Sequence, residues 1–208
     1  VIVSQLHRSP GIFFDHDKGK THAGGRLLFS ARIIPIRGSW LDLEFDPKDL
    51  IYVRIDRRRK MPVTILLKAM GNTAEDILNY FYDVEKVKID GKKLLLSLNE
   101  AVLGDKAPED IKGPGNEVVV KKGRKITKAS LKRLSELNLK QLPVENEYIA
   151  GKILARDVAD PETGEVLFRC NTELTRERLE TVFQKGISDL EFLHIEEDGS
   201  NTSIRDTL

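Results

Sequence analysis

Residues 34–60 read IPIRGSWLDLEFDPKDLIYVRIDRRRK, and this stretch decides how the first part of the chain folds. Apolar and acidic residues alternate over 41–45, which is the period of a half-buried strand. Asp46-Pro47 then predicts a turn, because proline presets its own backbone angle and aspartate bonds the neighbouring backbone. Alternation returns over 50–55. Two such strands around a short loop predict a β-hairpin.

The far end of this hairpin holds the densest cationic run of the sequence. A single anion, Asp56, stands among five cations, Arg54, Arg57, Arg58, Arg59 and Lys60. A run of this kind can be a solvated face or can blunt a sheet edge. A local charge of +4 can also meet several phosphates. Trp40, the only tryptophan, follows a turn-like Arg-Gly-Ser, which favours an exposed ring over a core position.

Composition places the chain among globular proteins, with 208 residues, 40% of them apolar and 32% charged. No apolar run reaches the roughly twenty residues of a membrane span, and we expect no membrane partner. The single cysteine, Cys170, excludes an internal disulfide and fits a reducing cytoplasm. Because the chain has neither a starting Met nor a signal peptide, we expect a piece of a longer cytoplasmic protein.

The first part predicts further strands and short helices. We expect a strand over 27–36, a helix over 62–70 ended by Gly71, and a Thr73-capped helix that buries Ile77, Leu78 and Phe81. The apolar run 12–14 needs a core, and 1–6 reads as the end of a strand or helix. The loop over 15–22 has two histidines and two aspartates. Their spacing favours a solvated loop over a metal site.

After residue 83 the pattern changes. Alternating residues on either side of Asp90-Gly91 predict a second hairpin, 104–116 predicts a mobile loop, and 148–157 predicts a strand. Net charge is +3 over 1–83 and −2 over the rest, so an anionic partner would meet the first part.

An internal repeat occupies the second part. Residues of about 117–144 align without gaps with those of about 165–192, at an offset of 48. Each copy predicts a strand, a Thr-capped helix and a second strand, and Asn138 and Gly186 stand at equivalent helix ends. The fold class is therefore α+β: a mixed or antiparallel sheet with short helices, followed by two small repeated α+β modules.

Catalytic constellations are not apparent in the sequence. The four histidines lie in no recognisable nucleophile setting. The Asp-x-Asp pattern at 15–17 lies in the loop read above as solvated, so we expect no metal cluster of the kind that nucleotidyl transfer needs. The residues taken alone therefore predict a binding module without a catalytic or metal site.

Four motifs resemble the β subunit of bacterial DNA-directed RNA polymerase, in its lobe or β2 domain. They are VSQLHRSPG at 3–11, RIIP at 32–35, RGSWLD at 37–42 and RIDRRRK at 54–60. The close resemblance covers about 1–82 and resumes near 203–208. Residues 84–201 resemble, more loosely, a lineage-specific insertion. The resemblance implies a partial lobe made of 1–83 and 202–208 with this insertion between them.

The resemblance also implies a role in holding promoter and downstream DNA. Trp40 would stack on an unpaired non-template base, and Arg8, Arg57, Arg58, Arg59 and Lys60 would lie near that strand. Asp56 would orient an arginine rather than touch DNA. The fragment would belong to a nucleotidyltransferase without carrying its catalytic centre or any cofactor, since the catalytic Mg²⁺ is bound by the β′ subunit in this family.

The implied partners are DNA and the other polymerase subunits, β′, α, ω and a sigma factor, in the nucleoid-associated cytoplasm. For the insertion we expect a docking surface for transcription regulators, with a passive spacer as the other possibility. Two alternatives to a polymerase fragment stay open. They are a free-standing nucleic-acid-binding domain and a stand-alone protein-interaction module without nucleic-acid binding.

Overall fold

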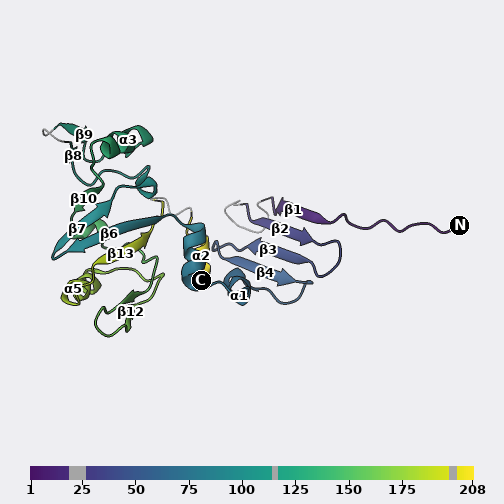
Figure 1. The fold of residues 1–208 in the computed structure, drawn as a ribbon. Helices are drawn as coiled ribbons and strands as arrows, with labels where there is room; N and C mark the ends of the chain where they lie inside the picture. The colour runs from purple at the N-terminus through teal and green to yellow at the C-terminus, as the bar shows by residue number, and fades with distance from the viewer. Residues whose placement is uncertain (19–26, 114–116, 197–200) are drawn as a thin grey trace. The chain divides into compact units, whose positions relative to one another are not determined.

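The computed structural model describes residues 1–18, 27–113, 117–196 and 201–208 (Figure 1). They form two compact units, one of Val1–Thr73 with Glu196–Leu208 and one of Ala74–Ile195. The helix after Thr73 groups with the second unit, and the expected domain limits at 83 and 202 stay a prediction. None of the helices in the described part of the chain is long and apolar enough to cross a membrane.

The first unit is built on one antiparallel sheet in the order β1-β2-β3-β4-β5. Its strands are β1 (Gly11–His16), β2 (Phe29–Ile34), β3 (Leu41–Phe45), β4 (Ile51–Ile55) and β5 (Met61–Pro62). The predicted hairpin is confirmed, since β3 and β4 pair from Leu41 opposite Ile55 to Phe45 opposite Ile51. The Asp46 carboxylate accepts the N–H groups of Lys48 and Leu50 and so closes the turn.

Two helices complete this unit, α1 (Val63–Ala69) and α6 (Ser203–Thr207). The end of the chain returns to the sheet through Thr207, whose hydroxyl accepts the Ile51 N–H at 3.0 Å. The Thr207 carbonyl accepts the Thr64 hydroxyl at 2.9 Å. Helix α6 is therefore held to both β4 and α1 although it lies more than 130 residues away in sequence.

Two expectations for the start of the chain are wrong. Residues 1–9 are irregular and exposed, not a strand or helix. Strand β1 is an edge strand that pairs only with β2, so Phe13 and Phe14 stay 46% and 82% exposed instead of entering a core. The loop expected over 15–22 lies partly outside the described residues, and His22 is among those not described.

The second unit centres on a four-stranded antiparallel sheet in the order β10-β7-β6-β13. Its strands are β6 (Val84–Asp90), β7 (Lys93–Ser97), β10 (Gln141–Val144) and β13 (Asp189–Leu193). The predicted hairpin around Asp90-Gly91 is the β6–β7 pair at the centre of this sheet. Helix α2 (Ala74–Phe81) precedes it and buries Ile77 and Leu78. Phe81 is 48% exposed, because Tyr82 completes the buried stripe in its place.

The remaining elements are short. They are η1 (Glu100–Val102), β8 (Ile111–Lys112), β9 (Val118–Val120), α3 (Lys128–Glu136), α4 (Asn146–Ile149), β11 (Val158–Ala159), β12 (Val166–Phe168) and α5 (Arg176–Gln184). Strand β8 pairs with β9 and β11 pairs with β12. Together with the antiparallel sheets they make an α+β fold.

The offset of 48 residues is visible in the bounds of the elements. Each bound of β12 and α5 lies 48 residues after the corresponding bound of β9 and α3. The copies do not, however, form two separate modules. Their last strands, β10 and β13, join opposite edges of one sheet, and α3 and α5 lie at its two ends (Figure 1). Residues of both copies share one hydrophobic core.

Two further expectations for this unit are wrong. In the loop expected over 104–116, the described part, 104–113, is not a loose loop, because Ala107 and Ile111 are each 2% exposed and β8 lies within it. Residues 114–116 lie outside the described residues. The segment 148–157 is not a strand. It begins in α4, passes through Gly151 at φ +89°, and makes only isolated bridges at Ile153 and Leu154.

Candidate nucleic-acid interface and a buried ion-pair network

Trp40 lies directly before β3, and the turn after β4 holds it in place. The Asp56 carboxylate accepts the Trp40 N–H at 2.9 Å and the Ser39 hydroxyl at 2.6 Å. The Asp56 N–H in turn donates to the Trp40 carbonyl at 2.9 Å. Asp56 and Arg57 both have left-handed backbone, with φ of 49° and 58°, which brings the carboxylate back to the start of the neighbouring strand.

These hydrogen bonds favour the ionised carboxylate. The Ser39 hydroxyl and the Trp40 N–H lower the pKa of Asp56 below its ordinary 3.8, and the charge of Arg58 lowers it further. The prediction that Asp56 orients an arginine is therefore incomplete. Its hydrogen bonds go to the Ser39 hydroxyl and the Trp40 backbone, so it fixes the segment that carries the indole.

Three guanidinium groups surround the indole of Trp40. The Cζ atoms of Arg8, Arg32 and Arg57 lie 5.5, 5.5 and 5.7 Å from its ring centroid, within cation–π distance. Arg32 is fixed by Asp42, with Nε 2.5 Å from Oδ1 and Nη2 3.3 Å from Oδ2. This bidentate pair raises the pKa of Arg32 and keeps its charge on the sheet.

Two hollows adjoin this cluster within the first unit. Gly38, Trp40, Asp56 and Arg57 line one of about 280 Å³. Arg8, Phe13, Arg32 and Asp42 are among the residues that line another of about 430 Å³. An aromatic face beside cations can accept a flat group and the anion that it carries.

The structure brings together four of the seven predicted site residues, Arg8, Trp40, Asp56 and Arg57. The other three, Arg58, Arg59 and Lys60, follow as an exposed run. The Lys60 ammonium lies over the ring of Tyr52, 4.4 Å from its centroid. Sequence reasoning missed Arg32 as a member of the cluster. Its place in RIIP, on the strand that pairs with β3, was the available signal.

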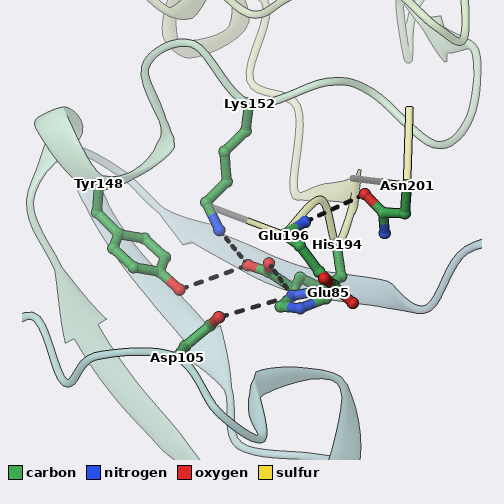
Figure 2. A network of polar contacts seen from close by, with 7 residues as sticks. All are labelled: Glu85, Asp105, Tyr148, Lys152, His194, Glu196 and Asn201. Atoms are coloured by element: carbon green, nitrogen blue, oxygen red, sulfur yellow. Dashed lines mark hydrogen bonds and ion pairs between the residues drawn. The ribbon is translucent and has the colours of Figure 1, made fainter. Parts of the chain in front are cut away.

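A second cluster lies inside the second unit, around the carboxylate of Glu85 (Figure 2). Glu85 is 2% exposed. It accepts the Lys152 ammonium in an ion pair, the Tyr148 hydroxyl at 3.4 Å, and pairs with His194 Nδ1 at 3.3 Å. Asp105 Oδ2 lies 3.7 Å from the same nitrogen of His194. The network therefore ties β6 to three segments that are distant in sequence.

Charge in this network is balanced internally. Burial alone would raise the pKa of Glu85, but His194 and Lys152 together hold it below its ordinary 4.5. The bond to Glu85 raises the pKa of His194 above 6.5, although burial opposes this. Burial, together with the charges of Glu85 and Asp105, raises the pKa of Tyr148, which stays a neutral hydroxyl donor.

Three side chains of this network could together ligate a metal ion. Glu85, Asp105 and His194 each bring a ligand atom within 4.8 Å of the others. Lys152 already neutralises Glu85, so a cation would have to displace an ammonium group from the same carboxylate. The arrangement fits a buried ion-pair network better than a metal centre.

Comparison with known proteins bears on the whole chain. Residues 8–133 match the family described as RNA polymerase Rpb2, domain 2. The chain is 50% identical over 209 residues to the DNA-directed RNA polymerase subunit beta of Syntrophotalea carbinolica. It is 52% identical over 210 residues to that of Sorangium cellulosum, and 52% identical over 211 residues to that of Syntrophobacter fumaroxidans.

These matches cover the whole of this chain but only 15% of each relative's length. They include the second unit as well as the first, so these relatives share both. The family match extends over more than half of the chain, from Arg8 to Arg133. The chain therefore belongs to the family of RNA polymerase Rpb2, domain 2, and over its whole length it is similar to bacterial DNA-directed RNA polymerase β subunits.

Proposed function

We propose that the first unit is the lobe of the β subunit and holds DNA during transcription, with Trp40 stacking on an unpaired base of the non-template strand. The observation that carries this proposal is the half-buried indole with three guanidinium groups 5.5–5.7 Å from its centroid. Stacking on an aromatic ring tolerates any base, and cations follow the phosphates, so the contact is independent of sequence.

The three arginines divide into two kinds. Arg32 is anchored by its bidentate pair with Asp42 and keeps a permanent charge beside the ring. Arg8 comes from an irregular exposed segment, and Arg57 from the exposed turn. Either can move from the indole to a phosphate when a base takes its place. When a base stacks on the indole, base stacking replaces the cation–π contact of the arginine, and the charge of the arginine stays close to the strand.

The exposed run of Arg58, Arg59 and Lys60 extends the cationic surface beyond the indole. These side chains would neutralise phosphates of the same strand without reading its bases. Asp56 does not meet DNA in this proposal. It fixes the loop that presents Trp40, through the hydrogen bonds to Ser39 and Trp40.

The test is the lifetime of promoter open complexes formed by whole polymerase with Trp40→Ala in its β subunit. Stacking is worth roughly 1–3 kcal/mol per base, so we expect at least a several-fold shorter lifetime. Trp40→Phe should recover part of it. Tyr80→Ala removes an aromatic ring that is 84% exposed on α2, and serves as the control. A lifetime unchanged by Trp40→Ala across different non-template bases would make Trp40 a packing residue.

For the second unit the proposal is that it is an insertion in the lobe and a docking surface for transcription regulators. Its support is a compact body with its own core between two segments of the first unit. Replacing 74–195 by a short Gly-Ser linker in whole polymerase tests this proposal. Regulator responses that all survive the deletion would make the unit a passive spacer.

The setting of both units is the assembled enzyme in the cytoplasm. There the β subunit works with β′, α, ω and a sigma factor in nucleotidyl transfer. In this proposal the catalytic Mg²⁺ is bound by another subunit, and the present chain contributes by positioning nucleic acid. A metal titration of the chain alone should then leave the environment of Trp40 unchanged.

A further inference from the structure

The two copies of the repeat in the second unit differ sharply in charge. Residues 121–133 contain seven Lys or Arg and no Asp or Glu. Six of these cations are exposed, namely Lys121, Lys122, Arg124, Lys125, Lys128 and Lys132. Acids near them include Glu136, at the end of α3, and Asp110, whose carboxylate accepts the Lys122 N–H at 2.7 Å. The seventh, Arg133, is held by Glu117 at 2.7 Å. The stretch therefore concentrates positive charge in a unit whose other residues have 13 Lys or Arg against 22 Asp or Glu.

The fold gathers this charge on one part of the surface. The Arg124 N–H donates to the Lys121 carbonyl, which closes a turn through Gly123 at φ +75°. Buried Ile126 then anchors the chain before α3 begins at Lys128. Lys128 and Lys132 are four residues apart, so they lie on the same side of the helix, roughly 6 Å from each other.

The second copy shows that the fold does not need this charge. Asn171 takes the place of Gly123 with φ 62°, and the Thr175 side chain caps α5 as Thr127 caps α3. Over the equivalent residues, 169–181, three cations are balanced by three anions. Because the same frame forms at zero net charge, the excess of cations in the first copy calls for a role outside folding.

The composition of this surface indicates the kind of partner. Protein–protein interfaces are depleted in lysine and enriched in aromatic residues around an apolar centre. Here five of the seven cations are lysines and 121–136 holds no aromatic residue. None of its described residues is an exposed large apolar side chain. Single-strand binders add aromatic stacking platforms, which are also missing from this stretch.

We propose that the turn 121–125 and helix α3 form a binding face for the phosphate backbone of double-stranded nucleic acid. Contact with the backbone needs only charge at suitable spacing, so the face binds duplexes regardless of sequence and weakens steeply with salt. This role is separate from that of Trp40, which lies in the other unit.

The repeat supplies a matched control for the test. Lys121→Gln with Lys128→Gln removes two cations from the first copy. Arg169→Gln with Arg176→Gln removes two cations from the same positions of the second copy. Binding of a labelled duplex of about 20 base pairs to the 208-residue chain is followed by fluorescence anisotropy from about 50 to 200 mM salt.

We expect the first-copy variant to bind several-fold more weakly, with a log–log salt slope smaller by about 1 for each lysine removed. The second-copy variant should keep both the affinity and the slope of the unchanged chain. Trp40→Ala should keep the slope difference between the two variants, which separates this inference from the proposed function of the first unit.

Three results would overturn the inference. The first is an equal loss in the two double variants, which would indicate diffuse attraction by the whole chain. The second is no loss in the first-copy variant. The third is that polyglutamate of equal charge competes as well as the duplex, which would assign the face to an acidic protein. All the substituted side chains are exposed, so unfolding is not expected, and unchanged circular dichroism would verify this.

Discussion

Substituting Lys152 by methionine should destabilise the second unit far more than an ordinary loss of one ion pair. Glu85 is 2% exposed, and Lys152 provides a permanent positive charge at its carboxylate. Without Lys152, the negative charge of Glu85 is stabilised by the Tyr148 hydroxyl at 3.4 Å and by His194 at 3.3 Å. Removing one partner of a buried pair costs about 3–5 kcal/mol, and we expect a loss of this size in the free energy of unfolding at neutral pH.

Two controls separate burial from ion pairing as such. The pair of Arg133 and Glu117 is also in direct contact, at 2.7 Å, but its side chains are 56% and 66% exposed. Arg133→Met should therefore cost no more than about 1 kcal/mol. Adding Glu85→Gln to Lys152→Met removes the buried charge while keeping a polar group beside the Tyr148 hydroxyl. The double variant should recover most of the stability lost by Lys152→Met.

Native-state hydrogen exchange in the 208-residue chain measures this loss within the second unit. Suitable amides are those of Leu193, bonded to the Ile153 carbonyl at 2.8 Å, and Leu154, bonded to the Thr172 carbonyl at 2.9 Å. The only tryptophan, Trp40, lies in the first unit, so its fluorescence should be unaffected. A loss below about 1 kcal/mol in Lys152→Met would refute the reasoning, since Glu85 would then need no fixed counter-charge.

Two other predictions concern single residues of the same unit. His194, which faces Glu85, Asp105 and the Lys152 ammonium, has a raised pKa, so its contribution to stability is complete below pH 6.5 and is lost as pH rises through its folded pKa. Glu85 has a lowered pKa, so its contribution is lost as pH falls below 4.5. Because His194 also helps to lower the pKa of Glu85, His194→Gln should flatten the alkaline decline in the thermal midpoint and also weaken the acid decline, and an unchanged profile would contradict this. Asn138 ends α3 at φ 59°, so Asn138→Ala should cost about 1 kcal/mol in unfolding free energy by denaturant titration while Asn138→Gly should not, and equal effects would count against backbone strain.

The parts of the fold that sequence reasoning predicted are those fixed by local signals. The β3–β4 hairpin follows from alternation and from Asp46, whose carboxylate bonds backbone only two and four residues away. Helices α3 and α5 are each followed by a residue with left-handed backbone, Asn138 at φ 59° and Gly186 at φ 65°, and this also follows from residue type. In the site, Trp40 and Arg57 could be named together because one stretch, 34–60, holds both, whereas Arg8 comes from the separate motif at 3–11 and was named through the resemblance.

The Glu85 network was missed because its members meet only in three dimensions. Glu85 lies 67 residues from Lys152 and 109 from His194. One local signal was available, since Glu85 shares the inward face of β6 with Val87, and both are buried. A carboxylate on the apolar face of an alternating strand needs a buried partner. The sequence does not say which of many lysines provides it.

The errors over 104–113 and 148–157 have a related cause. Glycine, proline and charged residues made the first segment resemble a loop, yet Ala107 and Ile111 are buried in the shared core. The apolar character of the second resembled a strand, yet it contributes single bridges at Ile153 and Leu154. In both segments the conformation depends on packing against the central sheet, which composition alone does not encode.

The divergence of the two copies also indicates where function can be changed without loss of the fold. An isolated β-bridge joins Lys106 to Lys125 in the first copy, and the equivalent bridge of the second copy joins Ile153 to Glu173. Pro108 and Ala155 each follow two residues after the first member of their bridge, so they are counterparts. The Ala155 N–H donates to the backbone carbonyl of Glu191 at 2.8 Å, so this segment covers the outer edge of β13.

Pro108 has no N–H with which to do the same for β10, the other edge strand. Strand β10 carries its own proline, Pro143, which removes a donor from that edge and discourages further strand pairing. The first copy thus differs from the second both in its edge and in its charge, while the turns and helix caps that set the frame stay equivalent. Substitutions that alter the basic face should therefore change binding and leave the shared core intact.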